Sequence, residues 1–232
     1  LQKYGVEGSM LKIGSAINEL TQNSTASGQF ISDYMMRLSG IATQAHMTSA
    51  ELAGLAAAAD ATGQEVEVSA TAMNKFVVQL QTHYKTVAKA AGMSAEELHS
   101  MLEEGRTTEA VLAVLQKLNE KGGLSMLAPL MKDLGSDGSR LTASLSTLAQ
   151  NIDLVREQVA LSNVAFKSGT SVINEYNVKN QNAAAIWEKM LNSWDKLFTN
   201  SANTGVVKDL AQDLYEFSKE LQRNDMFMTA LH

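Results

Sequence analysis

The stretch that decides the fold class is Thr48-Ser-Ala-Glu-Leu-Ala-Gly-Leu-Ala-Ala-Ala-Ala-Asp-Ala-Thr-Gly63. Thr48 and Glu51 have the spacing of a capping box, in which the threonine hydroxyl accepts a backbone N–H and the glutamate reaches back to the cap. The alanines and leucines that follow are strong helix formers. Gly63 is the residue type that most readily takes the left-handed conformation that ends a helix. The stretch therefore predicts a short, Ala-rich helix over 49–61.

Similar start and stop signals recur along the first 135 residues. Ser94-Ala-Glu-Glu97 is a second capping box, and it predicts a helix that ends at Gly105. Elsewhere apolar residues fall at three- and four-residue steps, as on the buried face of an amphipathic helix. Such helices are expected near 6–20, 28–41, 68–91, 109–120 and 124–134. Residues 1–135 are therefore expected to form a cluster of about seven short helices separated by glycine-rich turns.

Beyond residue 136 the apolar residues step by four and three, which is the repeat of a coiled-coil seam. This pattern predicts a long helix or a helical hairpin over 136–200, roughly 85 Å long if 141–198 were unbroken. A break is expected at 177–182, a polar run of poor helix formers. The predicted seam supplies the candidate helix-interface residues, Leu141, Leu145, Leu148, Ile152, Val155, Val159, Phe166, Ile173, Tyr176, Trp187, Met190, Trp194 and Leu197.

The predicted fold is all-α, with a cluster of short helices over 1–135, long coiled-coil-like helices over 136–200 and an amphipathic helix within 201–232. Composition agrees with this class, because 45 % of residues are hydrophobic but only 6 % are aromatic, and the chain holds a single proline. Sheets draw on β-branched and aromatic residues and need more turn residues than this chain offers.

Charge and residue content exclude several classes of function. The net charge is −6, and no run of Lys or Arg provides the positive field that nucleic acids require. The absence of cysteine excludes disulfides and thiolate metal sites. The longest stretches without Asp, Glu, Lys or Arg have 13 residues, whereas a membrane-spanning helix needs roughly 20 apolar residues. No nucleic acid and no membrane segment are therefore expected.

The sequence predicts no catalytic, cofactor or metal site. None of His46, His83, His99 and His232 has a metal-ligand spacing, and no phosphate-binding loop or nucleophile elbow is present. His99 lies near several glutamates, but a solvated helix face explains that pattern more simply than a metal site. Adjacent carboxylates diverge by about 100° on a helix, so they cannot flank one glycosidic bond. We therefore expect no enzyme.

The order of the segments resembles the core region of phage tail tape measure proteins. The resemblance covers about residues 28–200 and rests on the succession of caps, glycines and heptads, not on any chemical motif. The segments that carry it are 48–63, 92–98, 110–118, 130–135, 141–149, 168–171 with Glu175-Tyr176, and 183–194.

The resemblance implies a structural protein that sets the length of the phage tail tube. Its implied partners are tube, tail-tip and assembly-chaperone proteins, in the virion tail and in the bacterial cytoplasm during assembly. As one helix, 232 residues would span only ~350 Å, so the chain is expected to be part of a longer ruler. The heptads also predict self-association through the seam. A coiled-coil adaptor or signalling module is the alternative, and a peptidoglycan-cleaving enzyme is a remote third.

Overall fold

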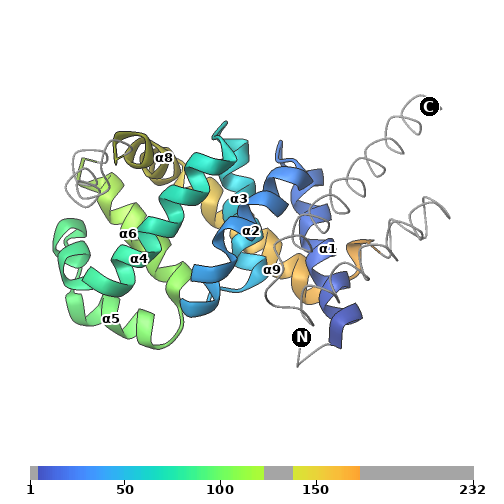
Figure 1. Ribbon diagram of the computed structural model, residues 1–232, viewed down its shortest axis with the longest axis horizontal. Coiled ribbons are helices and arrows are strands. Elements are labelled where there is room, and N and C mark those ends of the chain that lie inside the picture. Colours follow the sequence, from blue (N-terminus) through green and yellow to red (C-terminus); the bar gives the residue numbers. More distant parts are fainter. Residues whose placement is uncertain (1–4, 123–137, 173–232) are drawn as a thin grey trace.

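The computed structural model describes residues 5–122 and 138–172, and every regular element within them is an α-helix (Figure 1). The all-α fold class is confirmed. The helices are α1 (Gly5–Asn23), α2 (Gly28–Gln44), α3 (Ser49–Ala61), α4 (Val66–Ala91), α5 (Ala95–Glu103), α6 (Thr107–Glu120), α8 (Gly138–Gln150) and α9 (Ile152–Ser168). In Figure 1, α1 lies toward one end of the described residues and α5 toward the other.

Helix α3 is the central helix of the fold. Its buried residues, Ala50 and all of 52–59, point in every direction around the helix axis, and a helix that is apolar all round lies in a protein interior. It packs against α2 and α9 most extensively and against α1 and α4 as well. Alanine is the commonest buried side chain, so neighbouring helices can approach α3 closely.

The predicted start and stop of α3 are confirmed. Thr48 Oγ1 accepts a hydrogen bond from the Glu51 backbone N–H at 3.2 Å, and the Thr48 backbone N–H donates to Glu51 Oε2 at 2.7 Å. Gly63 follows the helix with a φ of 72°. Ser94 also begins α5, because its hydroxyl accepts from the Glu97 N–H at 3.2 Å, although only this half of the capping box predicted there is seen. Local sequence signals thus place both helices.

Replacing the cap residue is expected to weaken the fold measurably. Thr48→Ala removes the acceptor for the Glu51 N–H and should lower the free energy of unfolding by ~1 kcal/mol. Urea denaturation followed by circular dichroism measures this change. Thr86→Ala is the matched control, since Thr86 lies exposed in the interior of α4, where alanine is the better helix former. Equal losses for the two variants would contradict the role of the cap.

The expected long helix is not seen in the described residues. Helices α8 and α9 have 13 and 17 residues and are separated at Asn151, whose φ of −107° and ψ of 34° are not helical. Asn151 Nδ2 donates to the Thr147 carbonyl at 2.8 Å, a local bond that competes with helix continuation. Gly169, at a φ of 62°, ends α9. The helix predicted over 124–134, the break predicted at 177–182 and the helix predicted within 201–232 lie outside the described residues.

Helices α8 and α9 share one hydrophobic core with α1–α6. Helix α9 packs against α3 and α1, and α8 packs against α4 and α6. Their buried apolar residues belong to the same cluster as those of the first 122 residues. The described start of the 136–200 segment is therefore part of the globular unit. The division of the whole chain at 135 and 200 stays a prediction.

Candidate helix-interface site

The first six seam residues are buried within the chain. Leu141, Leu145, Leu148, Ile152, Val155 and Val159 are 0–8 % exposed and contribute to the core. Phe166 is half-buried against the edge of that core. The other six predicted interface residues, Ile173, Tyr176, Trp187, Met190, Trp194 and Leu197, lie outside the described residues. The first half of the seam is thus already covered by helices of the same chain and is not open to a second chain.

The crossing of α3 and α9 depends on a glycine. A Cβ atom on Gly54 would lie 2.5 Å from Val159 Cα and 2.8 Å from the Gln158 carbonyl oxygen, distances that real Cβ atoms do not adopt. Both neighbours are backbone atoms of α9, so they cannot rotate away. Ser162 Oγ donates to the Ala50 carbonyl at 2.6 Å at the same crossing. The two backbones are therefore in direct contact.

The C-terminal end of α9 is held by polar side chains of α1. Lys12 Nζ donates to the Lys167 carbonyl at 2.9 Å and lies 5.9 Å from the centre of the Phe166 ring. Asn18 Nδ2 donates to Ser171 Oγ at 2.8 Å. A cation at a helix C-terminus satisfies free carbonyls and interacts favourably with the helix dipole. The C-terminal end of α9 is thus fixed by contacts that the apolar pattern does not reveal.

Four buried polar atoms within the described residues have no hydrogen-bond partner: Tyr34 Oη, Thr108 Oγ1, Ser146 Oγ and Gln158 Oε1. Tyr34 is fully buried, and burial raises the pKa of its phenol well above the ordinary value because the charged form loses its hydration. Burial therefore favours the neutral form of the phenol. Its ring packs beside Phe30, with the ring centroids 6.2 Å apart, which is a role in packing.

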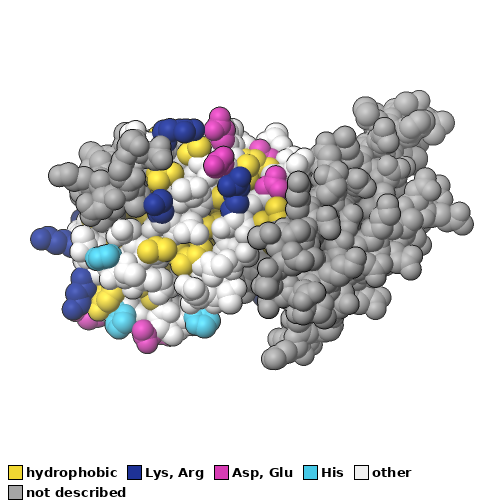
Figure 2. Space-filling model, in the orientation of Figure 1, with side chains coloured by type: hydrophobic (Ala, Val, Ile, Leu, Met, Phe, Trp, Pro, Cys, Tyr) yellow, Lys and Arg dark blue, Asp and Glu magenta, His cyan; other side chains and the backbone are white. Residues whose placement is uncertain are grey.

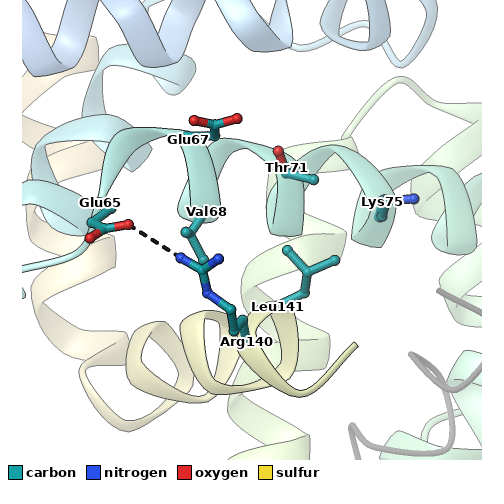
Figure 3. Close-up of a pocket in the computed structure, with 7 residues that line it drawn as sticks. All are labelled: Glu65, Glu67, Val68, Thr71, Lys75, Arg140 and Leu141. Atoms are coloured by element: carbon teal, nitrogen blue, oxygen red, sulfur yellow. Dashed lines mark hydrogen bonds and ion pairs between the residues drawn. The ribbon is translucent and has the colours of Figure 1, made fainter. Parts of the chain in front are cut away.

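A half-open pocket of about 370 Å³ lies between α4 and α8 (Figure 3). It is lined by Glu65, Glu67, Val68, Thr71, Lys75, Arg140 and Leu141. Glu65 and Arg140 form an ion pair of 3.4 Å across it, and both side chains are largely exposed. The two acidic and two basic side chains offset one another, so the pocket favours neither an anion nor a cation. Figure 2 likewise shows basic and acidic side chains intermixed on one face of the described residues.

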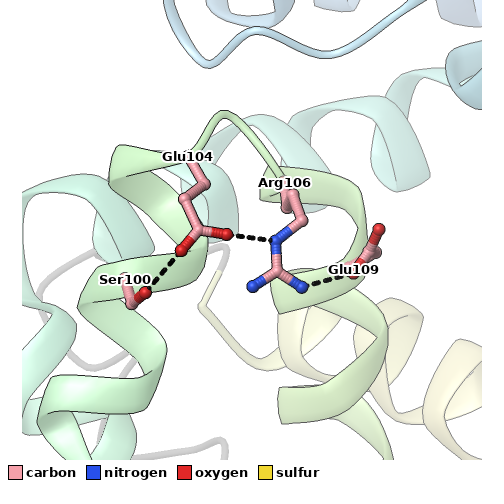
Figure 4. A network of polar contacts seen from close by, with 4 residues as sticks. All are labelled: Ser100, Glu104, Arg106 and Glu109. Carbon is pink, nitrogen blue, oxygen red and sulfur yellow. Dashed lines mark hydrogen bonds and ion pairs between the residues drawn. The ribbon is translucent and has the colours of Figure 1, made fainter.

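The turn between α5 and α6 is fixed by a network of polar contacts (Figure 4). Ser100 Oγ donates to Glu104 Oε1 at 2.7 Å, Arg106 Nε donates to Glu104 Oε2 at 2.8 Å, and Arg106 also pairs with Glu109 at 2.9 Å. The Ser100 hydroxyl and then Arg106 lower the pKa of the Glu104 carboxyl. The Glu104 carboxylate therefore stays ionised, and the positive charge of Arg106 balances it. Such an ion pair suits a structural contact better than proton transfer.

His99 does not join the nearby glutamates in a metal site. Its ring stacks on Tyr84, with centroids 4.5 Å apart and planes 10° from parallel. Over 5–122 and 138–172, no group of three or more His, Asp or Glu side chains is arranged to hold a metal ion. His83 lies exposed at a non-helical kink inside α4, where its Nδ1 contacts Thr82 Oγ1 at 2.7 Å.

Three comparisons with known proteins bear on identity. Models of protein families, curated proteins and solved structures were compared with the chain, and none of them matches it. In the part of the chain that the structure describes, no helix is both long enough and apolar enough to cross a membrane. Evidence on function therefore comes from the residues themselves and from where they lie.

Proposed function

We propose that the chain is the core segment of a phage tail tape measure protein, which contributes to tail-length determination and tail assembly through helix–helix contacts. The observation that supports this most is the role of the residues that carry the resemblance. Thr48 and Ser94 begin helices, and Gly92, at a φ of 65°, ends α4. Gly54 allows the close crossing of α3 and α9. Residues with such roles specify shape, which is what a structural assembly protein must encode.

A helical ruler has a simple physical basis. An α-helix rises 1.5 Å per residue, so the number of residues determines a length. The described helices form a globular module of the proposed ruler. We assign the coiled-coil-like contacts with tube, tail-tip or chaperone proteins to the six seam residues beyond 172, because the first six are occupied inside the module. The proposed location is the virion tail, after assembly in the bacterial cytoplasm.

Tail length in the phage that encodes the chain tests this proposal. In-frame deletion of the 232-residue segment should shorten tails, by ~350 Å if the segment is one extended helix in the tail and by less if the described helices stay globular there, as measured by electron microscopy. Replacement by an unrelated helical segment with the same number of residues is the control, and it should restore most of the length. Tails of unchanged length after the deletion would contradict the proposal and favour the adaptor alternative.

A further inference from the structure

The face of α9 that points away from the core carries its own regular pattern. Glu157, Ala160, Val164 and Lys167 are all exposed, and they are spaced by three, four and three residues. This spacing places them on one stripe of the helix, opposite the buried seam. We call these four residues the outer strip of α9. It is a helix-pairing pattern in a position where the chain's own described helices do not cover it.

The outer strip contains the most exposed large hydrophobic side chain that the structure describes. Val164 is 65 % exposed, whereas Val78, the next, is 37 % exposed. Leu161 lies half-buried beside it. A single exposed valine is ordinary on a protein surface. Here, however, it lies between charged residues at helix-pairing positions, and that arrangement suggests a partner helix.

The charges at the two ends of the strip are opposite, and neither forms an ion pair with another described residue. None of the ion pairs among residues 5–122 and 138–172 uses Glu157 or Lys167. The neighbouring Arg156 instead donates to Gln116 of α6. Glu157 lies three residues before Ala160, toward the N-terminus of α9, and Lys167 lies three residues after Val164, toward its C-terminus. A strip with an acid at one end and a base at the other is complementary to an antiparallel copy of itself, because each acid then faces a base.

We propose that the outer strip of α9 is a self-association surface for a second copy of this chain, with the two α9 helices antiparallel about a two-fold axis. In this register Glu157 lies opposite the partner's Lys167, and Ala160 lies opposite the partner's Val164. Each contact occurs twice, as an isologous interface requires. Because a large valine then faces a small alanine, the two helices can approach closely at the centre of the contact. The ion pairs flank this centre on both sides.

The dimer is expected to be weak and to depend on salt. A single helix face is small compared with stable interfaces, which bury roughly 1,200–2,000 Å². Exposed ion pairs contribute little individually and are screened by salt. Dimerisation should therefore be seen by sedimentation at high protein concentration and should weaken as ionic strength rises. The proposal depends only on the outer face of α9, so its failure would leave the proposed tail function untouched.

Charge exchange between two variants tests the register. Lys167→Glu alone, or Glu157→Lys alone, places like charges opposite each other and should weaken dimerisation on the order of tenfold. An equimolar mixture of the two variants restores both ion pairs and should dimerise as the parent chain does. Circular dichroism melting checks that each variant is folded. A parent chain that stays monomeric at every concentration, or a mixture no better than either variant alone, would overturn the proposal.

Cysteine cross-linking locates the contact, because the parent chain has no cysteine. A mixture of Ala160→Cys and Val164→Cys chains should form disulfide-linked heterodimers under mild oxidation, since opposed Cα atoms fall in the range of about 4.4–6.8 Å that disulfides need. Either variant alone should cross-link less, because identical positions are offset by about 6 Å along the helix. Val78→Cys is the control for random collision. Equal cross-linking in all samples would reject the proposed pairing.

Discussion

Val155→Asp is expected to unfold the protein at 25 °C, whereas Val164→Asp on the same helix should leave it folded. Val155 is 0 % exposed in the core, and Val164 is 65 % exposed. A carboxylate at position 155 would be buried without a partner, and the apolar burial of the valine would be lost as well. Together these terms cost on the order of 5 kcal/mol, which is comparable to the whole stability of many domains.

The pair of variants tests on which side of α9 the core lies. Far-ultraviolet circular dichroism and urea denaturation, both at low protein concentration, measure the outcome. Low concentration is needed because Val164 also belongs to the proposed dimer contact. The exposed substitution should change the free energy of unfolding by less than ~0.5 kcal/mol. Similar stability for the two variants would contradict the burial of the seam within this chain.

Gly54→Ala is expected to lower the free energy of unfolding by ~2 kcal/mol, although alanine is normally the better helix residue. The added Cβ would lie 2.5 Å from Val159 Cα, a backbone atom, so α3 and α9 would have to move apart. Moving them apart also weakens the bond from Ser162 Oγ to the Ala50 carbonyl. The steric cost therefore exceeds the gain in helix propensity.

Gly40→Ala is the matched control for this prediction. Gly40 lies within α2, it is exposed, and a Cβ added there meets no atom within 4 Å. Its replacement should raise the free energy of unfolding by about 0.5–1 kcal/mol. Urea denaturation of both variants gives the comparison. If both substitutions stabilised the protein, the close contact between α3 and α9 would be wrong.

The fold class and the ends of individual helices are predictable from the sequence because they depend on local chemistry. Thr48, Glu51 and Gly63 act only on the helix that they border, so their spacing is sufficient to place α3. The same holds for Ser94 at the start of α5. Caps and glycine stops are signals that need no knowledge of the neighbouring helices.

The break at Asn151 and the burial of the seam are not predictable in this way. A four-and-three repeat shows that one stripe of a helix must be covered, but it does not show whether the covering helix belongs to the same chain. Here α1, α3, α4 and α6 provide the cover, which is a property of the tertiary fold. Asn151 gave only a weak signal, because a single asparagine is tolerated within many helices.

The candidate interface combines predictable and unpredictable residues. Leu145, Leu148 and Val155 follow from apolar spacing, and the structure places them in the core. Gly54 was present as a lone glycine inside an alanine-rich helix, a pattern that often has a packing reason. Lys12 could not be found from sequence, because its partner carbonyls on α9 are more than 150 residues away.

Hydrogen exchange of the intact chain, measured by mass spectrometry, is the most direct test that α8 and α9 belong to the same core as α1–α6. Amides in the buried parts of α3 and α9 should exchange only on global unfolding, and therefore with the same high protection. Urea should reduce that protection in both helices together. A chain in which α8 and α9 exchange independently of α3, as a separate rod would, contradicts the account.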